Sequence, residues 1–161
     1  MKDVGIKLTN IWKVTCLDKD GNLKWQEDNK NLITTVGLNH ILDTQFHAST
    51  QVTTWYIGLK GAGTPVAGDT MASHSSWAEI SDYSGNRKEW TEGASSSGSM
   101  TNSSSVDFSI TGTATIAGAF LNTAATGTAG TLYGVVDFSS SRSVISGDTL
   151  QVTVTVTAAS A

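Results

Sequence analysis

The stretch Leu150-Gln151-Val152-Thr153-Val154-Thr155-Val156-Thr157 decides the fold class of this chain. Its aliphatic residues alternate strictly with polar ones, and this period of two predicts a β-strand with one face against a core. The other face is uncharged and consists of Gln151, Thr153, Thr155 and Thr157. Exposed strands usually carry charged residues that block edge-to-edge pairing, so an uncharged face is unusual. We expect residues 106–157, and this face in particular, to join copies of the chain in a homodimer or homotrimer.

Similar alternation extends over most of the chain. It predicts strands at 11–17, 23–26, 54–59, 87–91, 106–111, 113–121 and 132–138, besides the one at 150–157. Asp20-Gly21 and Ser146-Gly147-Asp148 indicate tight turns, because glycine adopts positive φ at little cost. No strand–helix–strand spacing suits a parallel sheet. The sequence therefore predicts an all-β fold, an antiparallel and jelly-roll-like β-sandwich of about eight or nine strands.

One short α-helix is predicted at residues 35–46. Thr34 or Thr35 can cap its first turn. Its apolar residues recur at the spacing of an amphipathic helix, at Leu38, Ile41, Leu42 and Phe46. Gly37 weakens this helix, because glycine is a poor helix former.

The domain organisation is predicted from composition. Residues 1–30 form an N-terminal strand and hairpin segment, and residues 31–161 form the β-sandwich domain. The segment 93–105 is rich in glycine and serine, and we interpret it as a mobile loop within that domain. From residue 93 onward the charged residues are sparse, namely Asp107, Asp137, Arg142 and Asp148.

Composition excludes several classes of partner. The chain has 161 residues, only 15% of them charged, and a net charge of −4, so the electrostatic footprint of a nucleic-acid-binding protein is missing. No apolar run approaches the roughly 18 residues of a membrane-spanning helix. Because the N-terminus lacks the apolar stretch of a secretory signal, we expect synthesis in a cytoplasm. The lone Cys16 is predicted to be a buried structural thiol.

Candidate chemical sites were weighed against structural roles. Asp18-x-Asp20 has glycine at the fourth position, whereas a calcium loop of the EF-hand type needs it at the sixth. Asp69, His74 and Ser75 or Ser76 contain the residue types of a hydrolase triad without a G-x-S-x-G turn. His40 and His47 lack metal-ligating neighbours at suitable spacing. An acidic cluster suits solvated strand ends as well as it suits a glycosidase pair, at Glu79, Asp82, Glu89 and Glu92. We therefore predict a protein that is not an enzyme, with no cofactor and no metal.

The tryptophans offer candidates for docking. Trp12 and Trp25 lie in the N-terminal hairpin segment, and tryptophan is enriched at interface hot spots. We take these two residues as candidates for docking onto a partner protein. The other three are predicted to anchor the core, at Trp55, Trp77 and Trp90.

Several blocks of this sequence carry a resemblance to a known family. They are Trp55-Tyr56-Ile57-Gly58-Leu59, Asp69-Thr70-Met71-Ala72-Ser73-His74-x-x-Trp77-x-Glu79, Arg87-x-x-Trp90, Phe108-Ser109-Ile110, Ala117-Gly118-Ala119-Phe120-Leu121 and Ser146-Gly147-Asp148-Thr149-Leu150. Over residues 30–157 the chain resembles small structural proteins of tailed bacteriophages, of the capsid decoration (cement) type. The block at 69–74 is its most specific part.

The resemblance implies a function. Decoration proteins are β-sandwiches that bind the outside of the capsid as small oligomers and bridge neighbouring major capsid subunits. The expected partners are the major capsid protein, with Trp12 and Trp25 as candidate capsid-docking residues, and further copies of this chain. The expected location is the outer capsid surface of the virion, after synthesis in the cytoplasm of the host bacterium. Two alternatives remain open: a tail-fibre or adhesin-type domain that recognises host-surface glycan through exposed tryptophan, and a neck or tail component.

Overall fold

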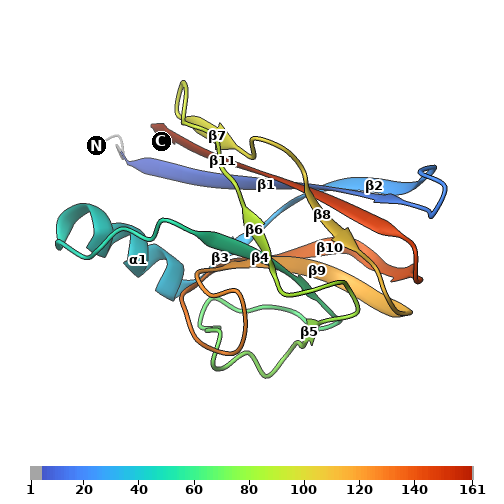
Figure 1. The fold of residues 1–161 in the computed structure, drawn as a ribbon. Helices are drawn as coiled ribbons and strands as arrows, with labels where there is room; N and C mark the ends of the chain where they lie inside the picture. The colour runs from blue at the N-terminus through green and yellow to red at the C-terminus, as the bar shows by residue number, and fades with distance from the viewer. Residues whose placement is uncertain (1–4, 161) are drawn as a thin grey trace.

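The computed structural model describes residues 5–160, which form two antiparallel sheets packed face to face and one short helix (Figure 1). The elements follow in the order β1 (Ile6–Leu17), β2 (Leu23–Lys30), β3 (Leu32–Ile33), α1 (Thr35–Phe46), β4 (Trp55–Lys60), β5 (Glu79–Ile80), β6 (Lys88–Trp90), β7 (Ser99–Thr101), β8 (Val106–Ser109), β9 (Ala114–Asn122), β10 (Leu132–Val144) and β11 (Thr149–Ser160).

The chain crosses repeatedly between the two sheets. Sheet A has the strand order β2-β1-β11-β7, and β8 also pairs with β11. Sheet B has the order β3-β10-β9-β4-β5, and β6 also pairs with β4. Every pairing is antiparallel, which confirms the predicted all-β sandwich with one short helix. The structure has more strands than predicted because β3, β5 and β7 are too short to show alternation.

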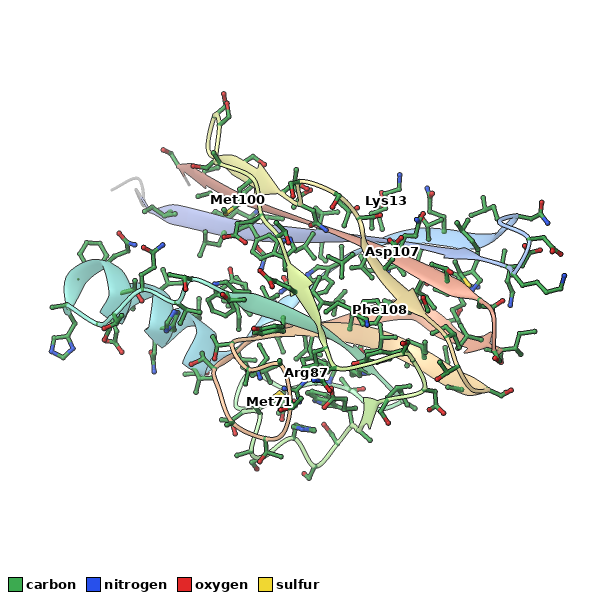
Figure 2. The ribbon with its side chains drawn as sticks, viewed as in Figure 1. Lys13, Met71, Arg87, Met100, Asp107 and Phe108 are labelled. Atoms are coloured by element: carbon green, nitrogen blue, oxygen red, sulfur yellow. The ribbon has the colours of Figure 1, made fainter. Side chains whose placement is uncertain are left out.

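The alternating residues of sheet A place their apolar side chains between the sheets. Leu150, Val152 and Val154 of β11 are fully buried, and Trp12 of β1 lies beside them with no exposed surface. Figure 2 shows Phe108 pointing into the same space between the sheets. Burial of each such side chain contributes about 1.5–3 kcal/mol to folding. This packing follows directly from the period of two.

The strand β11 lies in the middle of sheet A, not at its edge. It pairs with β1 over its whole length, from Ile6 opposite Ser160 to Leu17 opposite Thr149. Its other side is paired with β8 at one end and β7 at the other. Both edges of β11 are therefore occupied within the chain, so a contact between copies through this strand would use its outer face and not its edge.

The serine-rich segment 93–105 contains β7 rather than only a loop. A tight turn joins Ser96 to Ser99 through backbone hydrogen bonds, and β7 then runs along β11. Asn102 fixes the segment, because its side chain accepts a hydrogen bond from Val154 N at 2.8 Å and donates one to Val152 O at 2.9 Å. Serine and threonine form a strand here because β11, which β1 holds in place, provides the pairing partner.

Residues 6–30 are an integral part of the sandwich. The strand β1 joins β2 on one side and β11 on the other, and the β1–β2 turn contains Gly21 at φ 82°. The predicted boundary between residues 30 and 31 therefore does not divide the chain into two independently packed units. The N-terminal hairpin completes sheet A and contributes to the common core.

A second, smaller core lies on the outer side of sheet B. Figure 2 shows Met71 and Arg87 below that sheet, away from the space between the sheets. The loop segments 61–78 and 123–131 cover this side (Figure 1). The buried apolar side chains of this second core are Met71, Trp77, Phe120, Leu132 and Val135. Strand β9 is therefore buried on both faces.

The helix α1 has the predicted bounds. Thr34 caps it, because its hydroxyl accepts a hydrogen bond from Gly37 N at 3.0 Å. Gly37 is buried against β10, and a Cβ atom there would lie 2.3 Å from the carbonyl oxygen of Tyr133. Glycine at this position thus permits a close backbone contact that attaches the helix to sheet B.

Candidate functional site

The block 69–77 builds the cover of sheet B and does not form a catalytic triad. The Asp69 carboxylate accepts hydrogen bonds from Trp77 Nε1 at 2.9 Å and from Val66 N at 3.0 Å. The ring of His74 stacks on Trp77 with 3.9 Å between centroids. Asp69 therefore holds the indole in place and does not orient His74. The most specific part of the family resemblance thus has a structural role in this fold.

A buried arginine ties the cover together. The guanidinium of Arg87 donates two hydrogen bonds to the Glu79 carboxylate, at 2.8 and 2.7 Å, and lies 5.2 Å from the Phe120 ring centroid. It also donates to the carbonyl oxygens of Ala124 and Gly127, at 2.8 and 2.6 Å. The rigid fork of arginine suits this arrangement, because five donors can serve several acceptors at once.

A buried lysine anchors the start of the cover. Lys60 has no exposed side-chain surface, and its ammonium group lies 2.6 Å from a carboxylate oxygen of Asp137. It also donates to the carbonyl oxygens of Gly61 and Gly63, at 3.1 and 2.5 Å. The two buried cations of this region, Lys60 and Arg87, are thus both used in contacts within the chain.

The outer face of sheet A carries the four residues predicted to mediate self-association. Their side chains are half-buried, and three of them contact neighbouring strands. Thr155 Oγ1 donates to Thr101 Oγ1 at 3.1 Å, Thr157 Oγ1 lies 3.2 Å from Ser99 Oγ, and Gln151 Nε2 donates to Asp107 at 3.3 Å. Thr153 lies opposite Lys13 of β1. The face is therefore uncharged only along β11, and its role in self-association remains a prediction.

The two predicted docking tryptophans lie in different environments. Trp12 is fully buried in the core, so it cannot form part of a docking surface in this fold, and that assignment is wrong for it. Its position on the inward side of β1 explains the burial. Trp25 is half-buried on β2, where its ring lies 5.9 Å from that of Phe138 and 5.3 Å from the Arg142 guanidinium. A docking role for Trp25 remains a prediction.

Burial governs the titration of the buried thiol and phenol groups. It raises the pKa of Cys16 to about 11 and that of Tyr83 to about 12. Cys16 is free and buried, as predicted from its place in the alternating pattern. A thiol with such a pKa stays protonated at neutral pH and is a poor nucleophile.

Residues 5–160 contain neither a cluster suited to a metal ion nor a helix able to span a membrane. No group of three or more His, Cys, Asp or Glu side chains in this range could hold a metal ion. The helix described there, α1, is too short and too polar to cross a membrane.

An apolar patch lies at the end of the sandwich that carries α1. Figure 1 shows this helix at the same end as the start of β1 and the end of β11. Exposed fractions are 83% for Phe46, 79% for Ile6, 55% for Leu42 and 45% for Leu38. We name this surface, which Leu32 of β3 extends, the α1-end patch: Ile6, Leu32, Leu38, Leu42 and Phe46.

A groove and a deeper hollow accompany the α1-end patch. The groove runs between the start of β1 and α1, and its lining includes Leu8, Ile41 and Gln45 besides residues of the patch. The hollow, of about 250 Å³, reaches between the two sheets. The side chains that line the hollow are Leu8, Ile41, Trp55, Trp90, Met100, Leu121, Tyr133 and Val156.

The sequence interpretation did not identify the α1-end patch as a surface. The helical spacing of Leu38, Leu42 and Phe46 was recognised, but spacing alone does not show whether an apolar face is covered. The sequence signal that could have indicated this surface is Gly37. A helix that contacts its sheet through a glycine leaves its large side chains free to contact other neighbours.

Comparison with known proteins places the chain in a phage family. A family model described as podophage GP4 fiber I protein gp80 matches residues 32–159, about four fifths of the chain. The chain belongs to this family. It is therefore a bacteriophage structural protein and a component of the virion, which confirms the coarser part of what the sequence resemblance implied. A search of curated proteins found no match.

The family match changes which type of phage structural protein is favoured. The resemblance suggested capsid decoration, whereas the family description names a fibre. The matched range begins in β3 and ends in β11, so it includes α1 and both covering loops but not β1 or β2.

Proposed function

We propose that this chain is a structural component of a podophage tail fibre and acts by assembly, without catalysis and without a cofactor. The observation that carries the proposal is the match of residues 32–159 to a family described as a fibre protein. This range covers most of the sandwich, including the α1 end, so the likeness concerns the fold as a whole and not one short motif.

The internal use of charged groups supports this proposal. Arg87 and Lys60 are buried and bound to carboxylates and carbonyl oxygens of the same chain. A catalytic site needs groups that can change protonation or bind substrate in a cleft. A structural component needs rigidity and surfaces that fit its neighbours. The proposed partners are further copies of this chain and adjoining virion proteins.

Labelling of intact virions tests the proposal. Gold-labelled antibody against this chain is imaged on purified phage by electron microscopy, with a phage that lacks the gene as the control. We expect the label on the fibres. A label distributed over the capsid would overturn the fibre proposal in favour of capsid decoration, with the major capsid protein as partner. A label at the neck would favour a neck component.

A further inference from the structure

We propose that the α1-end patch is a self-association surface on which α1 of a second copy of this chain packs. The inference rests on the proposed function, since it assigns a contact between copies that a fibre component would use. The expected contact between copies is thereby assigned to the α1-end patch and not to the outer face of sheet A. Unlike that face, the α1-end patch consists of exposed apolar side chains.

The exposed apolar area of the α1-end patch is large for a protein of 161 residues. Phe46, Ile6 and Leu42 are each more than half exposed, and Leu38 and Leu32 are exposed in part. Together their exposed parts amount to roughly 500 Å², near the upper end of the ~300–600 Å² that the largest apolar patch of a monomer reaches. A standard interface buries about 800 Å² per partner, so these five residues supply more than half of it.

The patch combines a ridge and a groove. Leu42 and Phe46 project from α1, whereas the groove between α1 and β1 lies beside them and leads past Leu8 and Ile41 to the hollow. A helix that lays its apolar ridge in an apolar groove is a recurrent mode of recognition. Because ridge and groove lie side by side on one patch, two copies related by a two-fold axis can each receive the helix of the other.

The charges at the margins of the patch are consistent with this pairing. Lys7 and Lys30 lie on the strand side, where they line a separate, open pocket together with Ile6 and Leu38. Asp43 is exposed on the helix. A two-fold arrangement brings the helix side of one copy toward the strand side of the other, and the opposite charges then lie closer together. This complementarity between two parts of one patch favours a second copy over an unrelated protein.

The outer face of sheet A is the weaker alternative for the contact between copies. Its hydroxyl and amide groups already bond to neighbouring strands, and Lys13 and Asp28 lie on the same face. Covering it would remove water from three ionised groups, Lys13, Asp28 and Asp107, without burying large apolar side chains. Among residues 5–160, no ionised side chain lines the α1-end groove.

Sedimentation velocity of the full chain tests the inference. The wild type is measured from about 1 µM to about 1 mM, the range in which weak and moderate dimers dissociate. We expect association that depends on concentration. Phe46→Glu and Leu42→Glu should each raise the dissociation constant by at least about 30-fold, the loss expected at an interface hot spot. Circular dichroism and chemical unfolding confirm that these variants, changed at exposed positions, remain folded.

Val66→Glu is the matched control. Val66 is as exposed as Leu42 but lies in the cover of sheet B. It should associate like the wild type. A wild type that stays monomeric over the whole range, or association that survives both Phe46→Glu and Leu42→Glu, would overturn the inference. Virion labelling is independent of this measurement: label on the fibres with no effect of Phe46→Glu rejects the surface alone, and label on the capsid rejects the fibre assignment.

Discussion

The two sheets of the sandwich differ in what covers their outer faces. The outer face of sheet B is covered by the chain's own loops, which bury a second core and two cationic side chains. The outer face of sheet A is bare and carries hydroxyl and amide groups that bond across its strands. This difference indicates that the sequence blocks 69–77 and 87–90 stabilise the fold. Contacts with other chains are therefore expected on other surfaces of the molecule.

Removal of Trp77 should cause the largest loss of stability. Its ring lies 5.4 Å from that of Phe120, and its Nε1 donates to buried Asp69. Trp77→Ala leaves a cavity and removes one of the two hydrogen bonds to the Asp69 carboxylate, so the free energy of unfolding should fall by about 3–5 kcal/mol. Urea unfolding followed by circular dichroism measures it. The same change at half-buried Trp25 of sheet A should cost less than half as much. Equal costs would contradict the assigned role of the cover.

Removal of Arg87 should have the next largest effect. Arg87→Met leaves Glu79 and two carbonyl oxygens without their donor, and we expect a loss of about 2–4 kcal/mol, also measured by urea unfolding. The double variant with Glu79→Gln should recover part of this loss, because the unpaired carboxylate is gone. Arg142→Met is the control, since Arg142 is one-third exposed and such pairs contribute under about 1 kcal/mol. A cost for Arg87→Met as small as the control's would show that the cover is held by packing alone.

The alternation of side chains made most of sheets A and B predictable. A residue's position in a period-two pattern determines which face it occupies, so the core positions of β11 and of β8 could be stated beforehand. The helix bounds were predictable for a similar reason, because the Thr34 cap and the spacing of Leu38 and Leu42 are local signals.

Contacts between distant segments were not predictable from local patterns. Trp12 was assigned to docking because tryptophan is common both in cores and at interfaces, and only the pairing of β1 with β11 decides between them. Likewise, the serine-rich segment 93–105 forms β7 only because β11 is there to pair with. The α1-end patch depends on where α1 is attached, which follows from the contact of Gly37 with Tyr133.

An ion pair between the sheets should make stability depend on acid pH. Glu27 of β2 accepts hydrogen bonds from Ser139 N and Oγ on β10, at 2.9 and 2.5 Å, and lies 3.3 Å from Arg142 Nε. Burial alone would raise the pKa of Glu27, but the hydrogen bonds from Ser139 and Arg142 outweigh it and lower the pKa below 4.5. The unfolded chain therefore binds this proton at higher pH than the folded chain does.

The expected pH effect has a defined direction. The stabilisation from Glu27 should be fully present above about pH 4.5 and be lost as the pH falls through the lowered pKa of the folded state. Its slope cannot exceed about 1.4 kcal/mol per pH unit for one proton. Unfolding measured between about pH 3 and 7 should therefore show a flatter profile for Glu27→Gln than for the wild type. A profile for Glu27→Gln as steep as that of the wild type would contradict this assignment.

Charge substitutions on the bare face should have the smallest effects. Thr153 lies opposite Lys13, and Lys13 lies opposite Asp28 on its other side. Opposite charges on directly paired residues of neighbouring strands stabilise a sheet by about 0.2–1 kcal/mol, and like charges destabilise it similarly. Thr153→Lys should therefore be less stable than Thr153→Glu by about 0.5 kcal/mol in low salt. The difference should shrink at about 1 M salt, where the screening length falls to about 3 Å. Neither variant should change the sedimentation behaviour, because this face lies outside the α1-end patch. If Thr153→Lys abolished association instead, the bare face and not the helix end would join the copies.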